Sequence, residues 1–299
     1  MEGVLNFFID VLKFGLPYSV LALGIFISYR ILDFADLGAE GSYTLGGAVV
    51  AICLYHSLNP FLSLLISIVC GFLAGIITGV LHTKLRIPKL LSGIITMTAL
   101  FSINMFIMGF GSKGNTSGYA SNVYLNGKNT NGVVIKTIYD TFLGFFSAKN
   151  YNIIFINILL VVLVLAIIYF FFGTEIGMSV RSTGMNEAMS RAQGINTSLM
   201  IILGLGISNA LIAMSGALYT QVNRTANNTM GVGVLVIGLA SIIIGEAIFG
   251  KRSFKNWILS VTFGAVIYYL VICLALKLGL PDYCKKLLYA LLITIVLVI

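Results

Sequence analysis

Charged residues are scarce in this chain: Asp, Glu, Lys and Arg make up only 9% of its 299 residues, against roughly 25% in soluble domains. Hydrophobic residues make up 59%, and the mean hydropathy is +1.02. These values exclude an ordinary soluble protein and predict one that lies in a lipid bilayer. Because a membrane-spanning helix needs about 20 apolar residues, the length allows roughly eight to ten spans and no sizeable soluble domain.

Residue types that bind metals or perform catalysis are also scarce. The two histidines have no acidic or cysteine neighbour, and the four cysteines show no CxxC or CxxH spacing, so we expect neither a metal site nor a disulfide. The sequence contains no GxSxG, HExxH or Walker A motif, so any ATP must be hydrolysed by another chain. The net charge of +8 is scattered over many short loops, which is typical of lipid-headgroup anchors and speaks against a nucleic-acid partner. We expect no cofactor in this chain. The residues concerned are His56, His82, Cys53, Cys70, Cys273 and Cys284.

The chain contains many long runs of apolar residues. They predict an all-α polytopic membrane protein with about nine transmembrane segments, some of them broken or re-entrant. Residues 1–13 are expected to form a short interfacial helix ahead of the first span. The predicted segments are residues 14–31, 42–57, 60–82, 89–110, 151–172, 199–222, 231–249, 255–279 and 285–299.

Two polar stretches, residues 33–42 and 223–233, interrupt the apolar pattern. Unwound backbone at membrane depth is tolerated where it is buried in protein or lines water, so each stretch predicts a loop or a re-entrant turn. The acids near the membrane either form an ion or proton site or pair with bases such as Arg30, Lys251 and Arg252, and we favour pairing. These acids are Asp33, Asp36, Glu40 and Glu246.

The long segment 111–150 is rich in Gly, Asn, Ser and Thr around short apolar patches. A loop of this length inside a compact bundle is functional or mobile. We interpret it as an extracellular cap with a short interfacial helix at Val133–Phe146.

Several polar side chains fall inside apolar runs, where they need hydrogen-bond partners. Asn104 lies eight residues after Thr96, about two helical turns, so the two could share one face. The functional interpretation is a substrate-lining face, and the alternative is hydrogen bonding between helices. The asparagines are the better candidates, because Ser and Thr can bond to their own helix carbonyls. The candidate pathway residues are Thr96, Thr98, Ser102, Asn104, Ser208 and Asn209.

The polar segment Gly173–Ser198 collects four charged side chains between two long apolar runs. Within it, an acid near the start at Glu187 and a helix stop at Gly194 predict a short exposed helix. Such a helix between two spans is either an ordinary capped helix within a loop or a docking site for another protein.

Four separated stretches of the chain resemble sequences of a known protein family. They are LALGIFISYRILDFADLGAEGSYTLGGAV (21–49), IPKLLSGIITMTALFSINMFIMG (87–109), RSTGMNEAMSRAQGIN (181–196) and MGVGVLVIGLASIIIGEAIF (230–249). Together they resemble ABC importer permeases of the branched-chain amino acid and ribose permease superfamily, in particular the branch of uncharacterised and tryptophan/tyrosine-type permeases. The chain differs from that pattern in having no proline near Ala35 and no acid near Asn227.

The resemblance implies a single transmembrane permease domain over residues 1–299, in the bacterial plasma membrane. Residues 173–198 would be the cytosolic coupling loop, and residues 111–150 would lie outside. The implied partners are ABC ATPase subunits that bind ATP and Mg, an extracytoplasmic substrate-binding protein and a second copy of the permease. The implied substrate is an amino acid, and the branch resembled points to an aromatic one. The ATPase-coupling residues would be Met185, Asn186, Glu187, Ala188, Met189, Arg191, Gly194 and Ile195.

An ion-coupled secondary transporter or channel is the alternative function. It would need a buried ion or proton site near the midplane of the bilayer, supplied by Asp33, Asp36 or Glu246. An integral membrane enzyme is a weaker alternative, because the sequence shows no combination of nucleophile and base.

Overall fold

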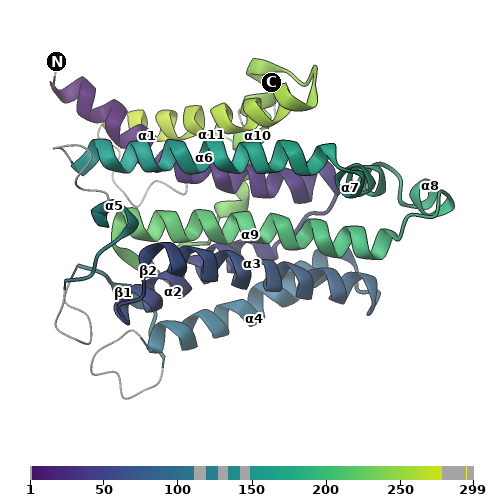
Figure 1. The fold of residues 1–299 in the computed structure, drawn as a ribbon, viewed down its shortest axis with the longest axis horizontal. Helices are drawn as coiled ribbons and strands as arrows, with labels where there is room; N and C mark the ends of the chain where they lie inside the picture. Colours follow the sequence, from purple (N-terminus) through teal and green to yellow (C-terminus); the bar gives the residue numbers. More distant parts are fainter. Residues whose placement is uncertain (1, 111–118, 127–133, 142–148, 278–293, 295–299) are drawn as a thin grey trace.

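The computed structural model describes residues 2–110, 119–126, 134–141, 149–277 and 294, and it is built almost entirely from helices (Figure 1). A short two-stranded antiparallel sheet joins two distant parts of the chain. The elements are α1 (Glu2–Ile25), the π-helix η1 (Phe26–Ile31), α2 (Gly38–Tyr55), α3 (Pro60–Thr83), α4 (Lys89–Gly109), β1 (Asn122–Tyr124), α5 (Ile138–Thr141), α6 (Lys149–Gly173), α7 (Glu175–Met185), α8 (Glu187–Ala192), α9 (Thr197–Asn223), β2 (Thr225–Asn227), α10 (Val234–Phe249) and α11 (Phe254–Lys277).

Six helices of the described residues are long and apolar enough to cross a membrane, so the expected count of about nine spans is not confirmed. The predicted segment at 42–57 belongs to α2, which starts earlier and is buried along almost its whole length. The predicted segment at 231–249 corresponds to α10, which is too short to meet the same criterion. Residues 1–13 do not form a separate helix, because α1 runs unbroken from Glu2 through Pro17. The predicted segment 285–299 lies, apart from residue 294, outside the described residues.

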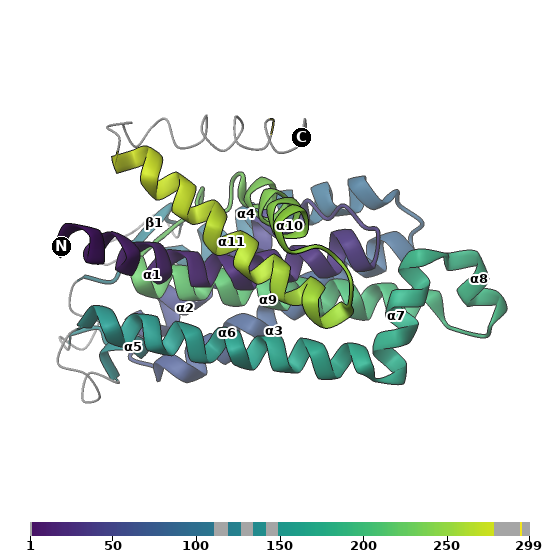
Figure 2. The same cartoon turned by 90° about the horizontal axis from the view of Figure 1, so that it is seen from above.

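The long helices lie side by side, and the polar elements sit at opposite ends of the bundle (Figures 1 and 2). The sheet and α5 occupy one end, together with the N-terminus, and α8 projects at the other. Helices α2 and α9 form the buried centre. Many large apolar side chains on α3, α4 and α6 are exposed, as expected of surfaces that contact lipid or another subunit.

Helix α3 packs against α9 through glycines spaced four residues apart, at Gly71, Gly75 and Gly79. A Cβ atom added at Gly75 would overlap the carbonyl oxygen of Leu205, so only glycine permits this approach of the two backbones. Such spacing of small residues lets helices associate closely in lipid, where packing replaces the hydrophobic effect. The contact of α3 with α9 is therefore a fixed element of the bundle.

The first interruption of the apolar pattern, at residues 33–42, follows η1 and returns the chain to the interior of the bundle. Asp36 is almost wholly buried there. Its Oδ1 accepts from the backbone N–H of Gly38 at 2.8 Å, and its Oδ2 accepts from Nδ2 of Asn209 at 2.7 Å. Because Asn209 lies in the middle of α9, α2 starts deep within the bundle. The expected pairing of Asp36 with a base is thus replaced by this hydrogen bond.

The expected pairing of acids with bases does hold for Glu246, near the end of α10. Its Oε2 contacts Arg30 Nη2 at 2.6 Å and Lys251 Nζ at 2.9 Å, and its Oε1 accepts from the indole N–H of Trp257 at 2.7 Å. The carboxylate ties η1, α10 and α11 together. Asp33 differs again, because its backbone carbonyl accepts from Lys89 Nζ at 2.9 Å.

The described part of the segment 111–150 forms an ordered cap on the end of α9. Strand β1 pairs with β2 in the register Asn122 with Asn227, and Asp140 forms an ion pair with Arg224 directly after α9. Of the expected helix at Val133–Phe146, the structure shows α5; Val133 and residues 142–146 lie outside the described residues.

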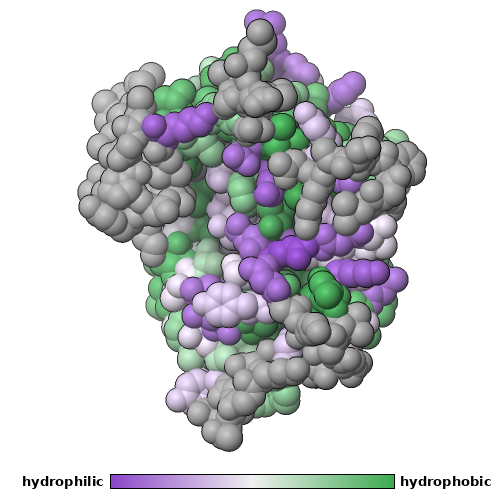
Figure 3. Space-filling view, turned by 90° about the vertical axis from the view of Figure 1, so that its left-hand side faces the viewer, coloured by the Kyte–Doolittle hydropathy of each residue, from purple (hydrophilic) through white to green (hydrophobic). Residues whose placement is uncertain are grey.

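Tyr139 of α5 donates from its hydroxyl to Asn157 Oδ1 at 2.7 Å, and burial raises the pKa of this phenol. Figure 3 shows hydrophilic side chains in a band across this end.

Candidate functional site

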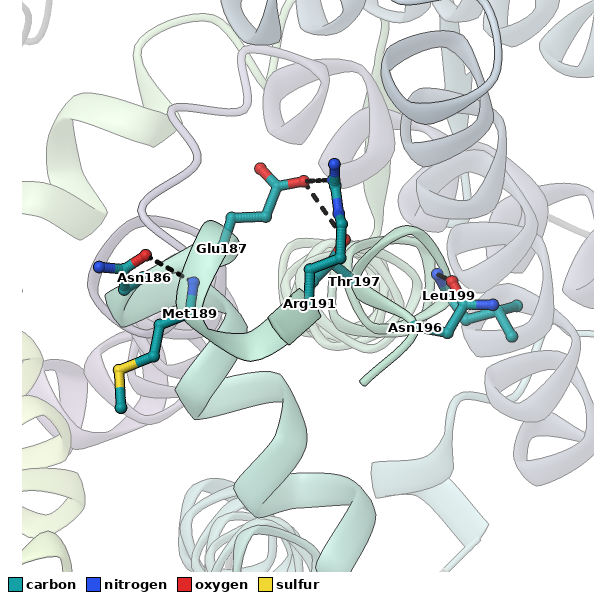
Figure 4. A network of polar contacts seen from close by, with 7 residues as sticks. All are labelled: Asn186, Glu187, Met189, Arg191, Asn196, Thr197 and Leu199. Atoms are coloured by element: carbon teal, nitrogen blue, oxygen red, sulfur yellow. Dashed lines mark hydrogen bonds and ion pairs between the residues drawn. The ribbon is translucent and has the colours of Figure 1, made fainter. Parts of the chain in front are cut away.

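The projecting segment α7–α8 is shaped by local capping. Asn186 begins α8 by accepting the backbone N–H of Met189 on its Oδ1 at 3.0 Å (Figure 4). Gly194, at φ +84°, follows the end of the helix. The N–H of Gly194 bonds to the Arg191 carbonyl and that of Ile195 to the Ser190 carbonyl, both at 3.1 Å. These two bonds form a Schellman motif, which explains the glycine at this position.

The two charged residues of α8 face each other and the start of α9. Glu187 Oε1 lies 2.5 Å from Arg191 Nη2, and the hydroxyl of Thr197 contacts both side chains at 3.3 and 3.2 Å (Figure 4). Thr197 is the first residue of α9 and is buried. This triad therefore links α8 to the first residue of α9.

Methionines form the outward surface of the segment. Met185, the last residue of α7, is 88% exposed, and Met189 is 59% exposed. Together with Met178, Arg181, Ser182 and Asn186 they line an open groove of about 390 Å³. Exposed, flexible methionines are typical of surfaces that adapt to a protein partner. The remaining predicted coupling residue, Ala188, is exposed as well.

The structure separates the predicted pathway residues into two groups. Thr96 and Asn104 share the buried face of α4, as their spacing predicted, whereas Thr98 and Ser102 lie on its exposed face. The hydroxyl of Thr78 donates to Thr96 Oγ1 at 2.9 Å. The alternative interpretation, hydrogen bonding between helices, therefore describes Thr96.

The two residues predicted on α9 also bond to other elements. Ser208 donates to the Gly24 carbonyl at 2.8 Å, and Asn209 donates to Asp36 as described above. Both side chains are fully buried. They join α9 to α1 and to the first interruption. The predicted pathway residues on α4 are far from them in the sequence.

Asn104 lines a small cavity between α2, α4 and the second interruption of the apolar pattern, at residues 223–233. Its Nδ2 donates to the Gly41 carbonyl at 3.1 Å, and the cavity measures about 30 Å³. Sequence reasoning did not assign Asn228 or Glu40 to such a site, although the polar run 223–233 marked the region. The lining residues are Glu40, Gly41, Thr44, Met97, Phe101, Asn104, Asn228, Gly231 and Val232.

Six long apolar helices of the described residues, packed with the buried α2 and extended at one end by α7 and α8, have the architecture of a multi-pass membrane protein. The family comparison agrees over nearly the whole chain: residues 7–297 match the model for the permease component of branched-chain amino acid transport systems. The chain belongs to this family.

Individual relatives are consistent with this assignment. The chain is 37% identical over 293 residues to the tyrosine transport system permease protein of Clostridioides difficile (strain R20291), covering 98% of this chain and 90% of that protein. It is 24% identical to the ribose import permease protein RbsC of Haemophilus influenzae, over 79% of this chain and 64% of that protein.

A solved structure shares the fold. PsaBC from Streptococcus pneumoniae, in complex with Fab, superposes with a TM-score of 0.54 at 18% identity, covering 99% of this chain and 91% of that one. At this identity the likeness concerns the architecture alone.

Proposed function

We propose that the chain is the membrane-spanning permease of an ATP-driven ABC importer in the bacterial plasma membrane, and that it carries an amino acid, with tyrosine the first candidate. The family and the identity to a tyrosine permease support this substrate class. The single observation that carries the ATP-driven part is the α7–α8 segment, which projects beyond the bundle with an exposed methionine groove.

In this proposal the α7–α8 end faces the cytosol, and two ATPase subunits, which bind ATP and Mg, dock below two copies of the chain. The sheet end faces outward and receives an extracytoplasmic substrate-binding protein. A second copy of the chain completes the pathway.

The contacts suggest how ATP binding reaches the pathway. Met185 and Met189 provide the surface that the ATPase holds. The triad of Glu187, Arg191 and Thr197 then passes the displacement of α8 to α9. Helix α9 carries it to the centre of the bundle.

An ion-coupled transporter or channel would need an available carboxylate at membrane depth. Glu246 instead contacts two cations and an indole N–H, and Asp36 accepts two hydrogen bonds. These contacts favour structural roles for Glu246 and Asp36, two of the three acids on which the ion-coupled alternative depends.

Hydrolysis of ATP by the purified permease with an ATPase encoded in the same genome tests the proposal. We expect the wild-type proteins to purify together. Met189→Asp places a charge in the docking groove and should lower stimulated hydrolysis about tenfold, which corresponds to about 1.4 kcal/mol of docking free energy. If no ATPase associates and Met189→Asp matches the wild type, ion-driven transport becomes the function to test.

A charge exchange distinguishes direct docking from positioning. Glu187→Arg and Arg191→Glu each remove the ion pair within α8 and should each weaken coupling. The double variant restores an ion pair of reversed polarity, so coupling should recover if the pair positions α8 on α9. Failure of the double variant to recover would show that Glu187 and Arg191 contact the ATPase themselves.

A further inference from the structure

The cavity beside Asn104 contains buried polar atoms that have no hydrogen-bond partner in the part of the chain that the structure describes. Asn104 is fully buried and Asn228 is 4% exposed. Among the described residues, Asn104 Oδ1 has no hydrogen-bond partner, and neither does either polar atom of the Asn228 side chain. Buried amides are almost always hydrogen-bonded, so such a cluster indicates a place where a ligand or water completes the bonding.

The groups that line the cavity are complementary to a zwitterion. Glu40 supplies a carboxylate, held by the backbone N–H of Gly233 on its Oε1 at 2.9 Å. This carboxylate and Asn104 Oδ1 are acceptors suited to an ammonium group, whereas Asn228 Nδ2 is a donor suited to a carboxylate. Met97 and Phe101 add an apolar wall.

We propose that this cavity is the closed form of a binding site for the α-amino and α-carboxylate groups of an amino acid on its way through the permease. The inference rests on the proposed importer function. Glu40 and Asn104 would hold the ammonium group, Asn228 the carboxylate, and Met97 and Phe101 the side chain.

The present volume of about 30 Å³ admits water rather than an amino acid. The site must therefore widen during transport. Helix α4 is the element placed to do this, since its described side chains are buried only along the face turned to α2 and α3. The backbone N–H of Asn228 also donates to the Ser121 carbonyl beside β1 at 2.8 Å. A displacement of β1 would therefore move Asn228 as well.

Uptake by the full permease, reconstituted in liposomes with its ATPase and binding protein, tests the site with labelled L-tyrosine as the probe. Asn228→Ala should lower uptake about tenfold, as expected for the loss of one hydrogen bond to a charged group. Asn228→Asp is nearly isosteric but sets a carboxylate against a carboxylate, so it should lower uptake further. Wild-type uptake by the folded Asn228→Ala variant would overturn the role assigned to Asn228.

Asn157→Ala is the matched control, because Asn157 is also buried but lines no part of this cavity. It should reduce thermal stability without reducing uptake by the folded fraction. Basal ATP hydrolysis separates the two proposals. If the variants hydrolyse ATP normally and import tyrosine like the wild type, the site is wrong and the importer stands; if no ATPase associates at all, the importer itself fails.

Photocrosslinking gives a second readout that does not depend on net uptake. 4-Azido-L-phenylalanine, added to the assembled permease, ATPase and binding protein in nanodiscs while ATP is hydrolysed, should label the peptide that contains Met97 and Phe101, because the cavity must widen before it admits the probe. L-Tyrosine should prevent the labelling, whereas tyramine, which lacks the carboxylate, should not. Labelling confined to other peptides, or equal protection by tyramine, would overturn the proposed site.

Discussion

The two sides of α2 are packed in opposite ways. On the side that faces α9, a Cβ atom added at Gly46 would overlap the carbonyl oxygen of Ala213, so the helices touch along their backbones. On the side that faces α4, the same helix leaves a cavity beside Asn104, whose Oδ1 is unpaired among the described residues. The difference indicates that α2, α3 and α9 form a fixed unit, and that α4 is the element able to separate from it.

The physical reason lies in how helices associate in lipid. Without a hydrophobic driving force, close backbone packing between small residues holds two helices together. Helices α3 and α9 have this packing at Gly71, Gly75 and Gly79. The interface of α2 with α4 is close at Gly41, where an added Cβ atom would lie 2.9 Å from the Leu100 side chain, but it also contains the cavity beside Asn104.

Replacing Gly75 by leucine should have the largest effect on this comparison. The new side chain has no space against the Leu205 carbonyl, and overpacking of this kind costs about 1–3 kcal/mol or more. We expect loss of monodisperse protein in size-exclusion chromatography, and a lowered Tm for the milder Gly75→Ala. Gly173→Ala is the control, since a Cβ atom there meets nothing within 4 Å. Equal Tm values for the two alanine variants would refute the fixed interface.

Gly231→Ala should have an intermediate effect, on transport more than on folding. A Cβ atom at this position would overlap the Glu40 carbonyl at the edge of the cavity. The second interruption would have to shift away from α2 and carry Asn228 with it. We expect reduced tyrosine uptake in liposomes with ATP hydrolysis retained. Unchanged uptake would mean that the position of this segment does not control the pathway.

Local rules made α8 predictable from the sequence, whereas the separate helix α7 was not expected. The glycine stop at Gly194 depends on residues within one helical turn. The same reasoning could not show that Glu187 and Arg191 turn toward Thr197, because that contact is set by how α9 enters the bundle.

The cavity shows where sequence reasoning ends. The spacing of Thr96 and Asn104 predicted a shared face, but not that this face is the buried one. Asn104 and Asn228 are 124 positions apart by their residue numbers, and only the tertiary fold brings them to one cavity. The apolar run 42–57 likewise indicated a helix but not its start at Gly38, which depends on the contact between Asp36 and Asn209.

Thr78→Val should have the smallest effect and tests the hydrogen bonding between α3 and α4. It removes the bond from Thr78 to Thr96 Oγ1 at nearly constant volume, and hydrogen bonds between membrane helices contribute about 0.6 kcal/mol on average. We expect a small drop in Tm. Thr98→Val is the control for stability, because the Thr98 hydroxyl donates to carbonyls of its own helix on the exposed face. If Thr78→Val instead destabilises the protein as strongly as Gly75→Ala, then α4 belongs to the fixed unit, and the widening of the cavity must come from the segment that carries Asn228.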